Sequence, residues 1–137
     1  MKSYYLDANI CITYLRGKNS YVREKVNSCP AEFIKIPAIV KAELATGALK
    51  SKNPDNETQK IEKFCEAFDI ISFDKEKEDI WPYARIRADL ESMGMKIGYN
   101  DTIIAATVLS RGGVLVTNNV KEFCRVEGLR IEDWTQE

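Results

Sequence analysis

Three carboxylates occupy positions where an acid can do chemistry, in a sequence of 137 residues that has no histidine. Asp7 follows a short apolar run, Glu43 lies inside a helical pattern, and Asp101 begins another helical pattern. In an α/β fold, the ends of the strands deliver side chains to one edge of the sheet. Without an imidazole, a group of acids at that edge indicates a divalent cation rather than a Ser-His or His-His mechanism.

Each acid also has a structural interpretation. Asp7 can cap the helix that follows it, because an aspartate before a helix accepts bonds from free backbone amides. Glu43 can simply point to solvent, and Asp101 can cap or stabilise the first turn of its helix. Together the three acids favour a metal site, because like charges raise one another's pKa unless a cation neutralises them. Mg²⁺ and Mn²⁺ suit two or three carboxylates and a phosphate substrate.

Polar residues follow a buried apolar run near the C-terminus, at the same expected edge of the sheet. Thr117, Asn118 and Asn119 can supply a hydroxyl and amides that orient a ligand or a water bound to a metal. The alternative is that they cap a helix and form a turn, which threonine and asparagine do well.

The elements that position these residues alternate along the chain. Apolar runs predict strands at residues 4–7, 33–36, 69–73, 114–117 and 129–131. Helical periodicity predicts a helix that opens at Pro37 and others at residues 9–15, 21–28, 58–68, 76–93, 101–111 and 118–123. Polar residues 50–57 predict a loop. This alternation predicts one domain over residues 1–137, a three-layer α/β/α sandwich with a central parallel sheet.

The composition limits the partners and the compartment. Lys and Arg number 20 against 21 Asp and Glu, so any nucleic acid must be held by a local basic patch. No stretch is long and apolar enough to span a bilayer, and the first residues lack a signal-peptide layout. The four cysteines lack CxxC pairing, which argues against zinc and predicts reduced thiols in a cytoplasm. Cys11 and Cys65 are predicted to be small core residues.

Several blocks of the sequence, in the same order and spacing, resemble the PIN-domain ribonucleases. These blocks are LDANICI (6–12), AELATG (42–47), IGYNDTIIAA (97–106) and LVTNN (115–119). The closing blocks resemble the VapC toxins of bacterial type II toxin–antitoxin modules: KEF (121–123), GL (128–129) and IEDW (131–134). The resemblance covers essentially the whole chain.

The resemblance implies a compact α/β/α domain with a Mg²⁺- or Mn²⁺-dependent endoribonuclease site. In that site Asp7 and Asp101 bind the metal, and Glu43 completes the acidic cluster. Asn119 is a further candidate catalytic residue, at a position where many PIN domains carry a fourth acid. Its neutral amide favours one tightly bound ion over two.

The resemblance also implies partners and an RNA target. It implies a homodimer and a cognate VapB-type antitoxin that inserts a C-terminal segment over the site, often with an arginine near the acids. The toxin would inhibit translation by cutting a structured RNA, with the tRNA anticodon loop favoured and a ribosomal RNA loop as the alternative. A PIN domain that binds RNA or a partner without cutting is a non-enzymatic alternative.

Residues that could position RNA surround the acids in the sequence. Tyr99 could stack on a base or pack, while Thr117, Asn118 and Arg87 could orient the substrate. The basic candidates for phosphate contact, or for plain solvated surface, are Lys41, Lys50, Lys52, Arg85, Arg87, Lys96 and Arg111. Trp81 and Trp134 are interpreted as core or interface residues.

The reaction hypothesis follows from the acids and the missing histidine. A water activated by the metal attacks a phosphodiester in line and leaves a 5′-phosphate and a 3′-hydroxyl. Histidine supplies the usual acid and base for attack by the ribose 2′-hydroxyl, and this chain has none. The alternative enzyme is an aspartyl-phosphate phosphatase of the haloacid dehalogenase type. Its chemistry requires a second acid two residues after the first, and this chain has Asn9 at that position.

Overall fold

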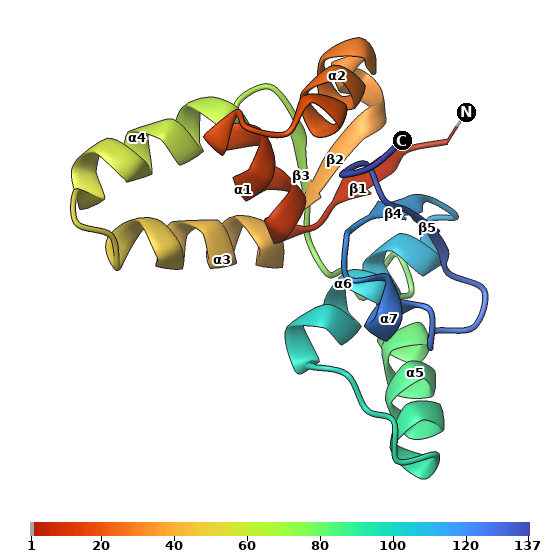
Figure 1. Ribbon diagram of the computed structural model, residues 1–137. Helices are drawn as coiled ribbons and strands as arrows, with labels where there is room; N and C mark the ends of the chain where they lie inside the picture. Colours follow the sequence, from red (N-terminus) through yellow and green to blue (C-terminus); the bar gives the residue numbers. More distant parts are fainter. Residues whose placement is uncertain (1) are drawn as a thin grey trace.

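Residues 2–137, which the computed structural model describes, alternate strands and helices as the sequence predicts (Figure 1). The strands are β1 (Tyr4–Leu6), β2 (Ile34–Pro37), β3 (Asp69–Ile71), β4 (Val114–Val116) and β5 (Arg130–Glu132). The helices are α1 (Ala8–Arg16), α2 (Ser20–Ser28), α3 (Ala38–Leu49), α4 (Pro54–Cys65), α5 (Ile80–Ser92), α6 (Tyr99–Ser110) and α7 (Val120–Phe123), with a short 3-10 helix at Ala31–Phe33.

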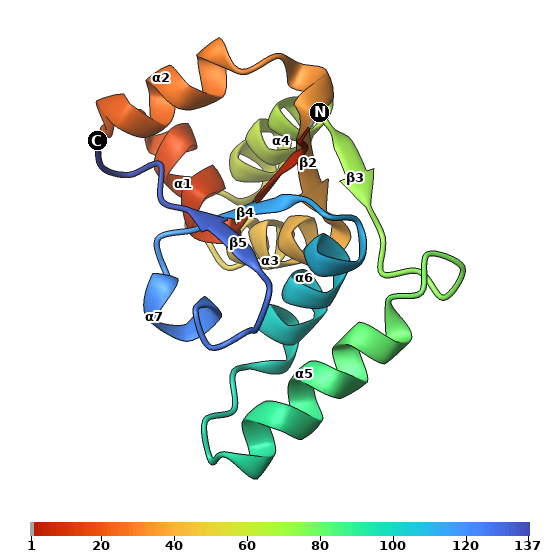
Figure 2. The ribbon, with the colours of Figure 1, turned by 90° about the vertical axis from the view of Figure 1, so that its right-hand side faces the viewer.

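The strands within residues 2–137 form one parallel sheet of five strands in the order β3-β2-β1-β4-β5 (Figure 2). Figure 1 shows α1 to α4 gathered on one side of the sheet and α5 to α7 on the other. The predicted three-layer α/β/α architecture is therefore confirmed. The chain runs outward from β1 to β3 and then crosses back to β4, so the connections change direction between β1 and β4. Parallel α/β sheets bind ligands at such a switch point.

The core forms around the middle strands. Leu6, Ile36, Leu115 and Val116 are fully buried, as expected for strands that are covered by helices on both faces. Cys11 is also fully buried, and Cys65 is nearly so, which confirms both as core residues. All four cysteines are free thiols.

The predicted loop at residues 50–57 is wrong in its second half, because α4 begins at Pro54. Proline suits the first helical position, where its missing N–H leaves no bond unmade. Asp55 and Glu57 lie in the first turn, where their charges stabilise the positive end of the helix dipole.

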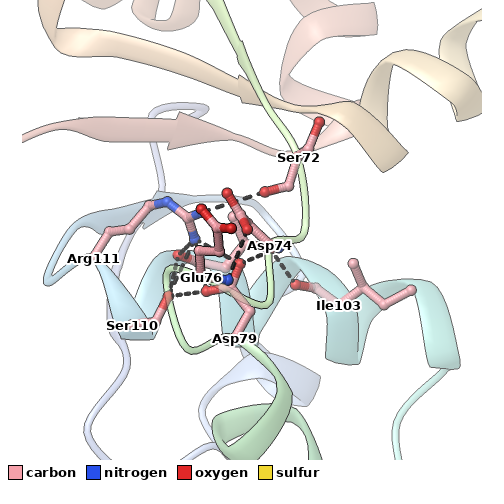
Figure 3. A network of polar contacts seen from close by, with 8 residues as sticks. Ser72, Asp74, Glu76, Asp79, Ile103, Ser110 and Arg111 are labelled. Carbon is pink, nitrogen blue, oxygen red and sulfur yellow. Dashed lines mark hydrogen bonds and ion pairs between the residues drawn. The ribbon is translucent and has the colours of Figure 1, made fainter.

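The predicted helix at 76–93 begins too early, because α5 starts only at Ile80. Residues 75–78 form a turn in which Glu78 has a positive φ of 62°. The following Asp79 is fully buried, and its carboxylate accepts bonds from the Asp74 backbone N–H (2.7 Å) and from Arg111 (Figure 3). These buried bonds fix the chain in a turn where side-chain periodicity alone predicts a helix.

The two tryptophans differ in burial. Trp134 is 4% exposed and packs against Tyr4 at a ring distance of 5.4 Å, so its prediction as a core residue is confirmed. Trp81 is 71% exposed on α5, so it is not a core residue, and an interface role stays a prediction. None of the helices in residues 2–137 combines the length and the apolar character that crossing a membrane requires.

Candidate active site

Asp7 lies directly after β1, at the switch point of the sheet, and it is 6% exposed. Its Oδ1 accepts a bond from the Ala8 backbone N–H (2.9 Å), so it caps α1 as the structural interpretation predicts. Its Oδ2 accepts a bond from the Thr117 hydroxyl (2.7 Å). Burial raises the pKa of Asp7, and these two bonds oppose the rise. Capping and a functional role are compatible, because each oxygen keeps a further lone pair.

Thr117 holds Asp7 in place from the neighbouring strand. It follows β4, is fully buried, and its Oγ1 also accepts a bond from the Asn119 backbone N–H (3.0 Å). A fully buried side chain does not reach a substrate, so its influence passes through the Asp7 carboxylate. The sequence left two roles open for Thr117, orienting a functional group and forming a turn. The hydroxyl has both, since it orients the Asp7 carboxylate and forms the turn before α7.

Asp101 lies in the first turn of α6, whose N-cap is Gly98. Asp101 is therefore not the cap of this helix. The pKa of Asp101 is raised to about 6, mainly by burial and in addition by the charges of Asp7, Glu122 and Glu43. Such shifts require nearby carboxylates, so residues far apart in the sequence converge here.

Glu43 reaches the same place from α3. Burial and the charge of Asp7 raise its pKa, and the Asn100 side chain opposes the rise. Among the residues that the structure describes, Glu43 Oε1 is the one buried side-chain oxygen or nitrogen without a hydrogen-bond partner. A buried carboxylate oxygen without a partner is costly, so this atom is suited to a ligand.

Glu122 is a member of the acidic cluster that sequence reasoning missed. It lies on α7, its charge helps to raise the pKa of Asp101, and its Oε2 accepts a bond from Asn119 Nδ2 (3.3 Å). A fourth acid is therefore present in the cluster. It lies three residues after Asn119, the position where many PIN domains carry this acid. The KEF block contains this glutamate, but a helix of four residues has too little periodicity to indicate which side faces the site.

The donor set suits a hard divalent cation. Four carboxylates repel one another here, and one of their buried oxygens has no hydrogen-bond partner. The four belong to Asp7, Glu43, Asp101 and Glu122. Within residues 2–137, no three acidic or cysteine side chains form a ready-made set of ligands. Mg²⁺ fits such a site because it needs only one or two direct carboxylates and keeps several waters, which other acids can hold.

The residues predicted to contact RNA differ in their surroundings. Tyr99 and Asn118 are exposed, and Arg87 lies on α5 with its guanidinium over the Tyr99 ring at 4.7 Å. Arg111 was predicted as a phosphate contact, and this is wrong, because its side chain is mostly buried and ion-paired to Asp79 at 2.9 Å. Lys41 pairs with a glutamate of α4.

Replacing Asp101 by asparagine should stabilise the metal-free protein at neutral pH. The folded-state pKa of about 6 lies above the value of ~3.9 for an unfolded aspartate. The ionised carboxylate therefore disfavours folding above pH 6, and this penalty disappears below about pH 4, where both states are protonated. Allowing for solvent screening, we expect a gain of about 1–2 kcal/mol at pH 7.5, or roughly 3–8 °C in Tm.

Thermal denaturation in EDTA at pH 7.5 and at pH 4 measures this gain. Asp55→Asn, at an exposed position in the first turn of α4, is the matched control; it removes a charge that favours the helix dipole, so it should lower Tm slightly at pH 7.5 instead of raising it. Equal Tm values for wild type and Asp101→Asn at pH 7.5 would mean that neither burial nor the neighbouring acids penalise the ionised Asp101 carboxylate.

Comparisons with known proteins agree with this geometry. The model of the PIN domain family matches residues 4–129. The tRNA(fMet)-specific endonuclease VapC of Shigella flexneri is 38% identical over 135 residues, which cover 98% of this chain and 100% of that protein. Its counterpart in Salmonella typhimurium is 36% identical over 134 residues, covering 98% and 99%.

A solved structure gives the same result. A chain in the crystal structure of DNA-bound VapBC from Salmonella typhimurium superposes with a TM-score of 0.89 at 36% identity, over 98% of this chain and 99% of that one. The resemblance seen in the sequence blocks is thereby confirmed. The chain therefore belongs to the PIN-domain family and, within it, to the VapC ribonucleases.

Proposed function

We propose that this protein is the toxin of a type II toxin–antitoxin module and that its ribonuclease activity depends on Mg²⁺ or Mn²⁺. The observation that supports the metal most directly is the convergence of four carboxylates: burial first, and then the charges of Asp7, Glu122 and Glu43, raise the pKa of Asp101 to about 6. Carboxylates this close together repel one another and destabilise the fold when no cation is bound, and they form a binding site for a divalent cation.

Within this proposal each acid has a role. Asp7 and Asp101 hold the ion, and the Thr117 hydroxyl fixes the orientation of Asp7. When bound, the ion lowers the pKa of water and stabilises the leaving oxygen of a phosphodiester. Glu43 Oε1, which is free of hydrogen bonds, accepts the proton of the attacking water. Asn119 and Glu122 hold each other beside Asp101.

The proposed substrate is a tRNA, cut in its anticodon loop. Two relatives that align with nearly the whole chain are tRNA(fMet)-specific endonucleases. An unpaired loop suits this acidic site, because the backbone of the loop can bend toward the metal while its bases unstack and turn outward. Initiator tRNA is therefore the first candidate, and a ribosomal RNA loop is the alternative outcome.

The proposed partner is a VapB-type antitoxin. The solved relative comes from a VapBC complex, and a groove of about 550 Å³ lies beside Glu43 between α1, α3 and α4. Apolar side chains of Ile12, Leu15 and Leu44 line it together with Arg16 and Lys60. An antitoxin segment in this groove would end next to the acids, where an arginine could neutralise them. A homodimer in the cytoplasm, where its free thiols would stay reduced, completes the proposal.

Incubation of purified protein with total tRNA and Mg²⁺, followed by mapping of the new RNA ends, tests this function. We expect one dominant cut in an anticodon loop, a 5′-phosphate on the downstream fragment, and loss of cutting in EDTA. A 2′,3′-cyclic phosphate product, or equal cutting in EDTA, would contradict the metal-dependent hydrolysis. RNA binding without any cutting would instead favour the inert PIN domain.

A further inference from the structure

A hollow beside the acidic cluster is not used by the proposed reaction. It measures about 280 Å³, lies between the end of α5 and the start of α6, and is lined by Glu91, Gly94, Lys96 and Tyr99. Pockets for drug-sized molecules range over ~300–1,000 Å³, so this hollow suits a smaller group, of the size of one nucleobase.

The hollow adjoins the site through the first turn of α6. Tyr99 begins this helix, and Asp101 lies two residues further on. Between them, Asn100 acts on the pKa of Glu43. A group held against Tyr99 is therefore within a nucleotide or two of the acids along an RNA strand.

The Tyr99 ring is exposed and yet held in place. It is 58% exposed, while the Arg87 guanidinium lies 4.7 Å from its centroid. Arg87 is itself fixed, since its Nε donates to Glu91 Oε2 at 2.8 Å and its Nη1 to the Tyr83 hydroxyl at 3.4 Å. A ring supported by a fixed cation loses little conformational freedom when a second planar group stacks on it.

The other lining residues fit a nucleotide. Lys96 places a positive charge at the hollow, where a phosphate of the same strand can pair with it. Gly94 adds no side chain to fill the space, and even a Cβ built there meets no atom within 4 Å. Glu91 uses Oε2 for Arg87, so its other carboxylate oxygen can accept a bond from a base amino group.

We propose that this hollow binds one unpaired nucleobase of the RNA substrate, stacked on Tyr99, and thereby positions the neighbouring phosphodiester over the acids. The proposal rests on the proposed ribonuclease function and adds a specificity-determining residue to it. Proteins that read single-stranded RNA stack its bases on aromatic side chains in this way.

Steady-state cleavage of a synthetic tRNA(fMet) anticodon stem–loop by Tyr99→Ala and Tyr99→Phe tests the proposal. Stacking on one aromatic side chain is worth roughly 5- to 150-fold in affinity. We expect Tyr99→Ala to raise KM by such a factor, while Tyr99→Phe stays within about twofold of wild type because it keeps the ring. Tyr21→Ala, at an exposed tyrosine of α2, is the matched control and should leave KM unchanged.

Substrates with one abasic site at each loop position separate stacking from a structural effect. Wild type should lose affinity at one position, and Tyr99→Ala should show no further loss there, because the interaction is already gone. If Tyr99→Ala keeps the wild-type KM while wild type cuts the RNA, the hollow is not a base site, and the proposed function stands. If wild type cuts neither this hairpin, nor total tRNA, nor ribosomal RNA, the proposed function fails, and the base site fails with it.

Discussion

Asp7→Asn should lower RNA cleavage by about a thousandfold or more. The substitution removes one negative charge from the centre of the acidic cluster, where a metal supplies several kcal/mol of transition-state stabilisation. It should leave the fold intact, because asparagine also caps helices and its side-chain oxygen can accept one of the two bonds that Asp7 now accepts. Initial rates on labelled tRNA measure the loss, and Tm verifies folding.

Asp55→Asn serves again as the control, because it makes the same chemical change on the exposed surface of α4. Its rate should match wild type. A rate for Asp7→Asn within tenfold of wild type, with an unchanged Tm, would contradict the role given to this carboxylate.

Arg111→Met should cost about 3–5 kcal/mol of folding stability, the cost of breaking a buried ion pair. Arg111 Nη1 donates to both oxygens of the fully buried Asp79 at 2.9 and 3.0 Å, and its Nη2 donates to the Ser72 carbonyl at 3.3 Å (Figure 3). Methionine leaves the Asp79 carboxylate buried without its cation. Thermal denaturation should show a Tm lower by roughly 10–20 °C.

Two further variants test whether the loss of stability comes from the buried ion pair. Lys60→Met breaks an ion pair with Glu57 whose partners are both exposed, and it should cost less than about 1 kcal/mol. The double variant Arg111→Met/Asp79→Leu replaces both buried charges and should recover part of the stability that the single change loses; the bond from the Asp74 backbone N–H to Asp79 stays lost. A loss below about 1 kcal/mol for Arg111→Met alone would contradict the structural role of this pair.

This pair also bears on the site. It ties the segment after β3 and the start of α5 to the end of α6, and α5 carries Arg87 while α6 carries Asp101. The arginine that the sequence suggested for RNA contact therefore maintains the arrangement of two helices that border the active site.

Much of the fold could be predicted from the sequence. Buried parallel strands leave continuous apolar runs such as residues 114–116, and the helices between them leave periodic apolar positions. Asp7 could be located because it follows such a run directly. The start of α5 could not, because the buried charge of Asp79 is explained only by Arg111, 32 residues further along the chain.

The candidate site was predictable in part for the same reason. Asp7, Glu43 and Asp101 each belong to an element whose type and end can be read locally, so the sheet topology brings them together. Glu122 lies on a helix of four residues that turns back toward α6 after β4, and no local pattern reports that contact. The dual role of Thr117 likewise depends on the pairing of β1 with β4.

The most direct test of the account is a titration of the purified protein with Mn²⁺, in which free Mn²⁺ is followed by electron paramagnetic resonance. The account predicts one saturable Mn²⁺ site per chain, from which Mg²⁺ displaces Mn²⁺, with affinity at least about tenfold weaker in Asp101→Asn, because the substitution removes one of the negative charges that attract the cation. Absence of saturable Mn²⁺ binding, or equal affinity in wild type and Asp101→Asn, would contradict the claim that these distant carboxylates jointly hold a metal ion.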